Sequence, residues 1–304
     1  MIKFPNIIEY SLLRAITTLL LSFPLDYSLI LSRFVADIFY LFPSKFRKRG
    51  LQHLRMAYPN KSADELERIL TGVFEHSAMM LVEVLSFPRK IRKYNYTKYV
   101  DVRGLELINE ALKGGKGVMF ISAHFGNWEL IGYTVSLLGH QINTVVRFMP
   151  NPAADALLNY SRRFQGQRII YNDNAVRDMM RVLKNNRILA LVCDQDARAN
   201  GIFVDFMGLP SSTVRSPALL HLKLGTPLLM LYCYRAKPNK FYYTFSFERC
   251  PLPELNPATA EEQITQAFTA DIERMIRKYP EQWMWIHRRW KTKPTPAGAK
   301  NGAA

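Results

Sequence analysis

The chain has 304 residues, 48% of them apolar, which is enough to bury a sizeable core in one large or two modest domains. A disordered or fibrous protein is therefore excluded. The 41 Lys and Arg exceed the 25 Asp and Glu by 16 charges, an excess that indicates anionic partners such as nucleic acid, phospholipid or an acidic carrier protein. No RNA-binding, zinc-finger or heptad-backed basic signature accompanies this charge, so we expect no nucleic-acid partner.

The cysteines indicate the compartment. Cys193, Cys233 and Cys250 form neither a paired disulfide framework nor a CxxC metal or redox motif, and such a pattern is typical of a reducing environment. We therefore expect the folded part of the chain to lie in the cytoplasm.

The N-terminal stretch at residues 7–42 is strongly apolar, but Arg14, Pro24 and Asp26 interrupt it. The two charges are separated by 11 residues, fewer than the about 20 that an unbroken membrane span needs. The stretch also lacks the cleavage site of a signal peptide, so we expect it to be retained. It fits a helix that crosses or half-crosses the bilayer, or an interfacial helical hairpin bent at Pro24. A pair of buried core helices is the alternative.

A basic cluster follows directly. Residues 45–49 have the sequence KFRKR, and Arg55 comes shortly after, where the anionic head groups of a cytoplasmic leaflet would lie. An ordinary solvated helix face has the same pattern. Ser62 then opens a capping box before apolar residues at helical spacing, which predicts a packing helix. We therefore expect a membrane-associating helical segment at residues 1–44 and a helical subdomain at residues 45–100.

From about Val102 onward, short apolar runs alternate with helical patterns. This order predicts an α/β domain at residues 101–293, with a largely parallel central sheet flanked by helices on both faces, followed by a flexible tail at 294–304. Ligand sites in such sheets gather at the carboxyl ends of the strands. The expected strands are 116–122, 142–148, 168–171, 188–193, 227–234 and 241–248, and the expected helices are 127–138, 152–164, 175–185 and 214–224.

The segment ISAHFGNWEL, at residues 121–130, lies where a strand is followed by a helix. His124 comes just past the carboxyl end of the strand, and Gly126 permits a tight turn. Asn127 is a good N-cap, and Glu129 falls in the first helical turn. We predict that the turn brings the Glu129 carboxylate to one nitrogen of the His124 ring. There it would fix the imidazole tautomer and stabilise the protonated ring.

This pair predicts a general base. The second ring nitrogen would accept the proton of an alcohol, and a base beside a thioester is sufficient for direct acyl transfer without a covalent enzyme intermediate. The five-residue spacing alone is weak evidence, because about 0.5 matches are expected by chance in this composition. The preceding strand, the glycine turn and the following helix strengthen it. A core histidine that is hydrogen-bonded to a neighbour is the alternative.

Competing chemistries lack their motifs. The sequence contains no G-x-S-x-G, H-E-x-x-H or G-x-x-x-x-G-K-[ST] pattern, which argues against a serine hydrolase elbow, the commonest zinc proteases and a P-loop. No cluster of further ligands accompanies His124 and Glu129, so we predict no metal and no other cofactor.

Residues 123–129, AHFGNWE, closely resemble the signature of the bacterial late lipid A acyltransferases, the lauroyl and myristoyl transferases within the wider lysophospholipid acyltransferase superfamily. The resemblance covers nearly the whole chain and includes the apolar, basic-flanked N-terminus. Further matching segments are VRFM at 146–149, CDQD at 193–196, FVDFMGLP at 203–210 and PEQWMWIHRRWK at 280–291.

The resemblance implies an O-acyltransferase that moves a fatty acyl chain from an acyl carrier protein or coenzyme A thioester to a hydroxyl of a phosphorylated glycolipid, the lipid A precursor. An acidic carrier protein suits the basic charge of the chain. The related glycerolipid enzymes usually carry Asp at the position of Glu129, which favours the lipid A branch. The implied location is the cytoplasmic face of the inner membrane. An enzyme for another glycolipid, such as a phosphatidylinositol mannoside, or for a lysophospholipid is an alternative, as is a catalytically silent lipid-binding protein.

Further residues are expected to contact substrate, Asn127 among them. Arg147 follows a strand, where a guanidinium can bind an acceptor phosphate or stabilise a developing oxyanion. Asp194 and Asp196 flank Gln195 after a later strand. At least one of these carboxylates is expected to position a basic side chain, although a turn or capping role is the ordinary interpretation.

Two more segments are open to two interpretations each. In GLPSST at residues 208–213, the hydroxyl of Ser212 and nearby amides resemble an anion-binding helix start, with Arg215 one turn inside the helix. An ordinary capped helix start fits equally well. The tryptophans of residues 283–290 alternate with basic side chains, a mixture expected at a lipid head-group boundary. Core packing with a solvated basic face is the alternative.

Overall fold

The computed structural model describes residues 22–149, 151–163, 166–172, 175–237 and 240–294, together with Ser11 and Thr18. Arg14, most of the chain before residue 22 and the tail after residue 294 lie outside the described residues. The predictions for these parts of the chain therefore stay predictions, as do the proposed domain boundaries.

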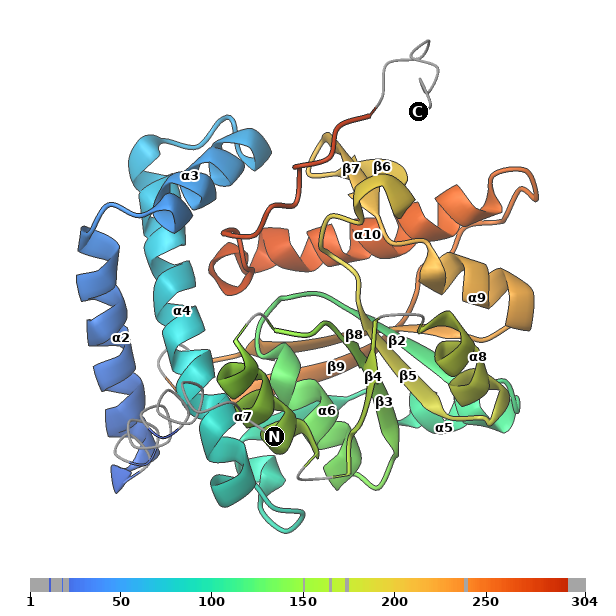
Figure 1. Ribbon diagram of the computed structural model, residues 1–304, viewed down its shortest axis with the longest axis horizontal. Coiled ribbons are helices and arrows are strands. Elements are labelled where there is room, and N and C mark those ends of the chain that lie inside the picture. Colours follow the sequence, from blue (N-terminus) through green and yellow to red (C-terminus); the bar gives the residue numbers. More distant parts are fainter. Residues whose placement is uncertain are drawn as a thin grey trace.

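Within the described residues, seven strands form one mostly parallel sheet in the order β1-β9-β8-β2-β5-β3-β4 (Figure 1). The predicted class, an α/β fold with a largely parallel central sheet flanked by helices, is confirmed. The two central strands consist almost wholly of buried residues, as expected when helices cover both faces. The strands are β1 (Val100–Arg103), β2 (Val118–Ser122), β3 (Ile142–Val146), β4 (Arg168–Tyr171), β5 (Ile188–Val192), β8 (Leu228–Arg235) and β9 (Tyr243–Arg249).

The sheet has one reversal of direction. β8, β2, β5, β3 and β4 all run the same way, whereas β9 runs antiparallel to β8 and carries β1 with it. The link from β8 to β9 spans residues 236–242, which is shorter than the dozen or so residues that a parallel crossover requires. The five strands of common direction therefore have their carboxyl ends along one edge of the sheet.

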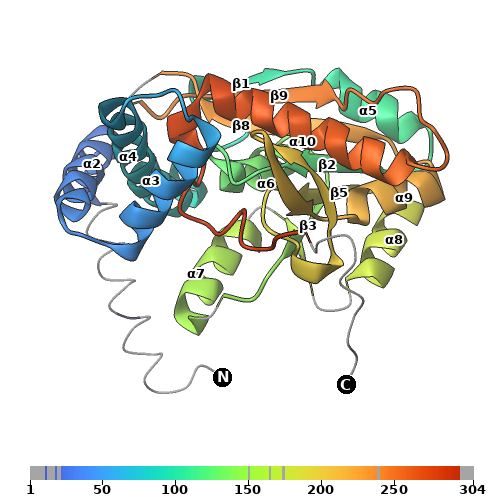
Figure 2. The ribbon, with the colours of Figure 1, turned by 90° about the horizontal axis from the view of Figure 1, so that it is seen from above.

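Helices cover both faces of the sheet (Figures 1 and 2). One face, which carries Phe120 and Leu231, packs against α5 and α6. The other face, which carries Ile121 and Leu191, packs against α8, α9 and α10. The helix bounds are α5 (Glu106–Lys113), α6 (Trp128–Leu137), α7 (Pro152–Arg163), α8 (Val176–Lys184), α9 (Ser216–Leu224) and α10 (Ala260–Lys278).

At one end of the molecule stand α2 (Leu25–Leu41), α3 (Lys45–Ala57) and α4 (Ala63–Lys90) (Figure 1). The capping box predicted at Ser62 is confirmed, because its side chain and that of Glu65 each accept the other's backbone N–H. α4 also packs into the core as predicted. Among the described helices, α4 is the one long and apolar enough to cross a membrane by length and composition, and 44% of that stretch is buried inside the protein.

α2 contains the described part of the apolar N-terminal stretch. Leu29, Ala36 and Tyr40 are buried, and Arg33 pairs with Glu75 of α4 at 2.8 Å. Most of the other side chains are apolar and exposed, so a wholly buried core helix is excluded for α2. Such a contiguous apolar surface marks contact with a membrane or a protein. The exposed residues are Tyr27, Ile30, Leu31, Phe34, Val35, Ile38, Phe39 and Leu41.

The prediction of a helix start at residues 208–213 is wrong. β6 (Ile202–Phe206) and β7 (Leu209–Thr213) form an antiparallel hairpin. Met207 and Gly208 both have positive φ, at 59° and 76°, which is the requirement of a two-residue hairpin turn. Ser212 is therefore buried in a strand and donates its hydroxyl to the carbonyl of Arg198 at 2.6 Å. Helix α9 begins later, with Arg215 at its N-cap rather than one turn inside.

Candidate active site

A crevice opens between the carboxyl ends of β5 and β3. From β3 the chain continues to α7 and β4 on one side, whereas from β5 it continues towards β8 on the other. Sheets of this class bind ligands where neighbouring connections leave in opposite directions. β3 pairs with β5 from Ile142 to Thr144 and not beyond. A cavity of about 310 Å³ lies at this place, and His124, Glu129 and Arg147 are among its lining residues.

The His124 ring is held by Asp194. Its Nδ1 lies 2.8 Å from Asp194 Oδ1, and its backbone N–H donates to Oδ2 at 3.0 Å. The two residues stand at the same offset past neighbouring parallel strands, because Ser122 and Val192 end β2 and β5 and pair with each other. Equal offsets from paired strand ends bring the two side chains to the same level. The expectation that one of the two aspartates positions a basic side chain is met at this histidine.

The surroundings of Asp194 keep it ionised. Trp283 donates its indole N–H to Oδ2 at 2.7 Å. Burial by itself would raise the pKa of Asp194, but the charge and hydrogen bond of His124, together with His287 and Trp283, hold it well below its usual value. Burial also lowers the pKa of His287 to about 3, although Asp194 opposes this shift. Asp194 is thus a carboxylate beside a neutral His287 at pH 7.

This arrangement defines the tautomer of His124. An ionised carboxylate can only accept hydrogen bonds, so Nδ1 carries a proton, and in the neutral ring the free lone pair is on Nε2. Gln195 Nε2 lies 3.2 Å from His124 Nε2. A ring with a carboxylate on one nitrogen and a lone pair on the other is the arrangement of a general base.

Glu129 lines the same cavity but has another partner. Arg162 of α7 donates Nε to Oε2 at 2.9 Å and Nη2 to Oε1 at 2.6 Å, a bidentate pair of mostly buried side chains. Both ring nitrogens of His124 are occupied by Asp194 and Gln195. The expected contact of Glu129 with the imidazole is therefore wrong. A planar guanidinium with two donors takes the carboxylate instead. The catalytic role of Glu129 stays a prediction.

The loop after β2 is fixed by buried contacts. Gly126 has φ +58°, and a Cβ there would lie 1.9 Å from the carbonyl oxygen of Cys233, so the predicted glycine turn is confirmed. Asn127 caps α6 by accepting the N–H of Leu130, and its amide donates to buried Glu83 at 3.0 Å. Asn127 is fully buried and is not among the residues that line the cavity. These contacts give Asn127 a structural function; its predicted contact with substrate stays a prediction.

The inner part of the cavity is mainly apolar, and Thr144 and Gln167 are polar residues within it. α6 lies close to Gln167 there, since a Cβ on Gly132 would lie 2.3 Å from the Gln167 amide carbon. Thr144 donates its hydroxyl to that amide at 2.9 Å. Because strands β2 and β5 lead down from His124 and Asp194, their buried side chains form walls below the polar mouth. The apolar lining includes Phe120, Ile131, Val145, Ala190, Leu191 and Leu231.

The other predicted binding residues divide into two groups. Arg147 is exposed and lines the cavity. Asp196, Ser212 and Arg215 do not line it. Asp196 accepts the hydroxyl of Thr292 at 2.9 Å, and Arg215 forms an exposed ion pair with Glu261. Their predicted substrate contacts stay predictions that the geometry does not favour.

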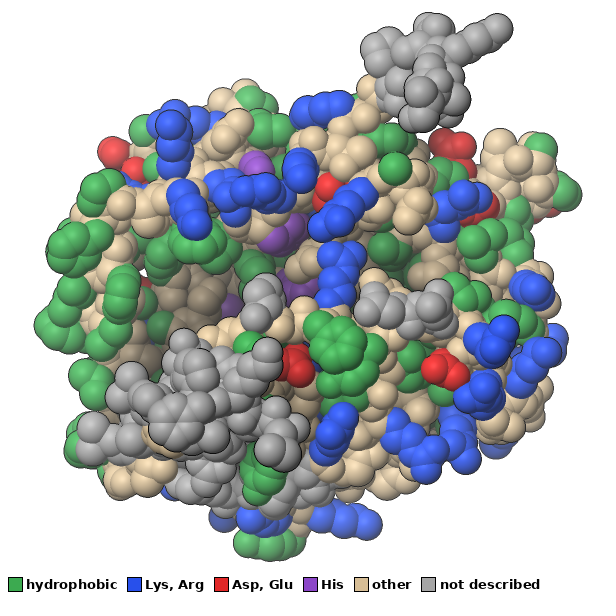
Figure 3. Space-filling model, in the orientation of Figure 1, with side chains coloured by type: hydrophobic (Ala, Val, Ile, Leu, Met, Phe, Trp, Pro, Cys, Tyr) green, Lys and Arg blue, Asp and Glu red, His purple; other side chains and the backbone are tan. Residues whose placement is uncertain are grey.

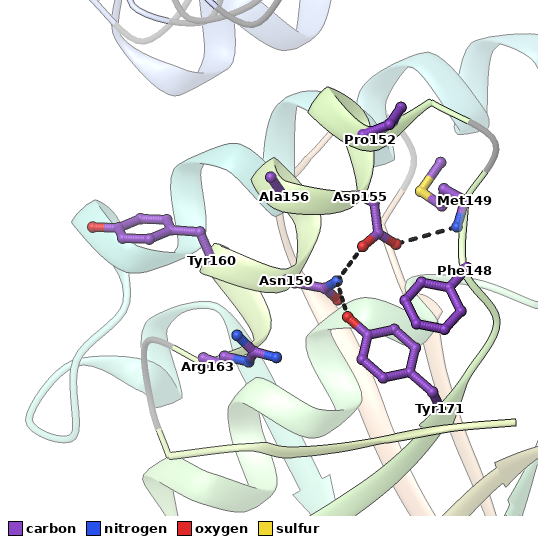
Figure 4. A pocket seen from close by; sticks show the side chains of 9 residues that line it. All are labelled: Phe148, Met149, Pro152, Asp155, Ala156, Asn159, Tyr160, Arg163 and Tyr171. Carbon is purple, nitrogen blue, oxygen red and sulfur yellow. Dashed lines mark hydrogen bonds between the residues drawn. The ribbon is translucent and has the colours of Figure 1, made fainter. Parts of the chain in front are cut away.

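A wider hollow adjoins the cavity and shares Met149 with it (Figure 4). Its volume is about 700 Å³. Phe148 and Tyr171 stack at 3.8 Å on one side. Asn159 donates to Asp155 and to the Tyr171 hydroxyl, and its carbonyl oxygen accepts from Arg162 at 3.1 Å. A chain of hydrogen bonds therefore joins this outer hollow to the Arg162–Glu129 pair.

Sequence reasoning did not assign roles to Arg162 or Gln195, and it left Trp283 between two interpretations. Trp283, Trp285 and Trp290 are at most 4% exposed, so core packing is confirmed for the tryptophans and the head-group interpretation is wrong. The solvated basic face that was expected with it is wrong at Arg289, which is buried and donates to Ser212 and Thr213. Arg162 gave no local signal, because it lies 33 residues from Glu129. Gln195 was visible as the residue between two aspartates after a strand, a position that reaches a cavity mouth.

The comparisons with known proteins identify the family. The sequence matches the family of bacterial lipid A biosynthesis acyltransferases over residues 2–292. The chain belongs to this family. The resemblance drawn from the motifs is thereby confirmed, and with it the class of enzyme, an acyltransferase. Within the described residues, no group of three or more His, Cys, Asp or Glu side chains is placed to hold a metal ion.

Individual relatives are distant but extensive. The chain is 27% identical over 253 residues to the lipid A biosynthesis palmitoleoyltransferase of Escherichia coli (strain K12), covering 80% of this chain and 78% of that protein. It is 24% identical over 258 residues to the lauroyltransferase of the same strain, covering 82% of each. A phosphatidylinositol mannoside acyltransferase of Mycobacterium tuberculosis (strain CDC 1551 / Oshkosh) is 25% identical over 194 residues, with 62% of this chain and 59% of that protein covered.

Proposed function

We propose that this acyltransferase moves a fatty acyl chain from a thioester onto a hydroxyl of a phosphorylated glycolipid, a lipid A precursor, with His124 as the general base. The observation that carries the proposal is the ring of His124, held by the Asp194 carboxylate, with Nε2 beside a cavity that is apolar further in.

The chemical step needs one proton acceptor. His124 Nε2 takes the proton of the acceptor hydroxyl as its oxygen forms a bond to the thioester carbonyl carbon. The carbon–sulfur bond then breaks, and the thiolate leaves with the proton from His124. Asp194 stabilises the positive ring between these events, as a buried carboxylate does in a catalytic triad. No covalent enzyme intermediate is required.

The two ends of the cavity suit the two parts of the reaction. The apolar inner walls provide for the acyl chain, since burying each methylene contributes about 0.8 kcal/mol. Arg147 at the mouth and Arg163 at the edge of the outer hollow provide guanidinium groups for acceptor phosphates. Glu129 fixes Arg162 in the wall between these regions, and we propose that it acts there by positioning rather than on the His124 ring.

We further propose that the enzyme works at the cytoplasmic face of the inner membrane. The exposed apolar surface of α2 would enter the lipid boundary, and the exposed Lys45, Lys48 and Arg55 of α3 beside it would contact anionic head groups. This arrangement would bring a membrane-held acceptor to the protein. The donor is an acyl carrier protein or coenzyme A thioester.

A different acceptor is the alternative. One of the similar proteins is named as an acyltransferase of a different glycolipid, phosphatidylinositol mannoside. A lysophospholipid would present a comparable hydroxyl. Purified protein tested against a panel of acceptors by mass spectrometry separates these cases, because a lipid A enzyme adds an acyl chain to the lipid A precursor and leaves the other acceptors unchanged.

The decisive experiment supplies an acyl carrier thioester and a tetraacylated lipid A precursor to the wild type and to His124→Ala. The wild type is expected to add the mass of one acyl chain. The variant should be slower by at least about a hundredfold, the usual contribution of a general base. Undiminished turnover in the variant would eliminate the mechanism. No product with any acceptor would favour a silent lipid-binding protein.

A further inference from the structure

The basic charge of the chain gathers in separate places. In Figure 3, Lys and Arg side chains collect over the region of α3 and again over the region of α8, with histidines of the central hollow between them. The first region adjoins the apolar surface of α2, so the proposed membrane contact accounts for it. The second region has no such explanation.

The basic residues of α8 share one face. Arg177, Arg181 and Lys184 follow one another at spacings of four and three residues and are all exposed, so they lie on the same side of the helix. Arg181 forms an exposed ion pair with Asp178 at 2.8 Å. Among the described residues, Arg177 and Lys184 have no ion-pair partner. Like charges at this spacing oppose helix formation, and an acidic partner would remove that repulsion.

Exposed apolar side chains border this charge. Val176 is 58% exposed on α8, and Leu219 and Leu222 are 45% and 47% exposed on α9, which contacts α8. Small apolar contacts with surrounding charge are typical of a protein interface, in which the charges steer the encounter and the apolar groups are desolvated. The surface therefore suits an acidic protein better than a free ion.

α8 also reaches the catalytic cavity. Met179 is buried on the opposite side of the helix and lines the cavity together with Asn172, just past the end of β4. A helix with its side chains is about 10–12 Å across. The basic face is thus one helix thickness from the cavity, a short path for a flexible arm that carries a thioester.

The position of α8 argues against a membrane contact. α2 and α8 lie towards opposite ends of the longest axis in both views (Figures 1 and 2). If α2 rests on the bilayer, α8 lies towards the end of the molecule that is far from it. A soluble partner can approach there.

We propose that this face of α8, formed by Val176, Arg177, Arg181 and Lys184, is the docking site of an acidic carrier protein that delivers the acyl thioester. The inference rests on the proposed function and concerns the carrier protein, one of the two donors named there.

The test reverses the charges of α8 with Arg177→Glu, Arg181→Glu and Lys184→Glu in one full-length variant. A matched control reverses Lys93, Lys98 and Lys240, three exposed lysines away from α8, and so changes the net charge equally. Two donors are compared, lauroyl acyl carrier protein and the neutral lauroyl N-acetylcysteamine thioester. Binding of the lauroyl carrier protein is also titrated directly by fluorescence anisotropy.

The expected result is a rise of at least tenfold in the KM and Kd for the carrier protein in the α8 variant, with unchanged turnover of the neutral thioester and little change in the control. Raised salt should weaken carrier binding by the wild type in the same way. Equal carrier binding by all three proteins overturns the proposal. So does an equal loss with both donors, or a loss of binding to anionic vesicles while carrier binding is kept. Because the neutral thioester reports acyl transfer alone and the titration needs no turnover, failure of the proposed function is distinguishable from failure of the docking site.

Discussion

Two carboxylates line or adjoin the same crevice, and their partners differ. Asp194, just past the end of β5, holds the ring of His124, whereas Glu129, in the first turn of α6, holds the guanidinium of Arg162. Glu129 follows His124 by five positions but does not contact its ring. Asp194, 70 positions away in the chain, does. In this protein the paired ends of two parallel strands, and not the short turn after β2, bring the carboxylate to the histidine. We infer that the β5 side carries the proton transfer and that the α6 side shapes the binding walls.

The largest effect is expected from Asp194→Asn. The amide keeps the shape of the side chain but favours the wrong tautomer of His124 and leaves the protonated ring without a counter-charge. By analogy with catalytic triads, kcat should fall about 10³- to 10⁴-fold with little change in KM. Single-turnover kinetics and circular dichroism of the folded variant check this. A loss of kcat below tenfold would contradict the role of Asp194 in proton transfer.

A smaller effect is expected from Glu129→Gln. This change removes the charge that holds Arg162 and displaces the cavity wall, and small displacements near a reacting centre cost up to about 100-fold. We expect a 10- to 100-fold loss of kcat/KM that falls mainly on KM. Arg162→Met removes the guanidinium that Glu129 binds, so it should likewise lower kcat/KM mainly by raising KM. If Glu129→Gln loses as much kcat as Asp194→Asn, Glu129 belongs to the chemistry after all.

Gly132, one turn after Glu129 on α6, tests whether this side of the cavity binds the acyl chain. Gly132→Leu would displace the Gln167 amide, whose carbon lies 2.3 Å from a Cβ placed on Gly132, and would narrow the cavity that both residues line. Because one methylene in an apolar pocket is worth about 10- to 200-fold in discrimination, preference should shift at least tenfold towards shorter donors. Mass spectrometry of products from mixed donors measures the shift. Gly114→Ala, at an exposed helix end, is the control and should leave the product distribution unaltered.

The smallest effect at neutral pH concerns His287. Its pKa is lowered by burial to about 3 in the folded protein, against about 6.5 in the unfolded chain. The unfolded state therefore binds the proton first, so the stability contributed by the neutral ring is complete above about pH 6.5 and falls as the pH drops towards 3. His287→Gln should flatten the pH dependence of the unfolding free energy by up to about 1.4 kcal/mol per pH unit. Urea titrations at pH 7 and pH 5 would contradict this if both proteins lost equal stability.

Local patterns were sufficient for much of the fold. Strand β4 has the predicted bounds, and the turn at Gly126 with its capped helix follows from residues that are adjacent in the chain. The reversal at β9 was not predicted, although the short link before it could have indicated it. The hairpin at residues 202–213 was missed because serine and threonine suit a helix start and a strand alike.

Only the part of the site that lies in a local motif could be predicted from the sequence. His124 stands in a local motif, so the sequence indicates it. Its pairing with Asp194 depends on the strand order, which places β5 beside β2 although two strands lie between them in the chain. The pairing of Glu129 with Arg162 depends on where α7 lies against α6, and no short-range pattern encodes that position.

The segment at residues 282–284, which follows α10, contacts both the histidine loop and Asp194. Gln282 accepts the N–H of Gly126, Met284 donates to the carbonyl of His124, and Trp283 donates to Asp194. One short segment therefore supports both partners of the proton transfer, the histidine loop and the carboxylate. A displacement of residues 282–284 would disturb both together, so the order of the site depends on the packing of the segment that follows α10.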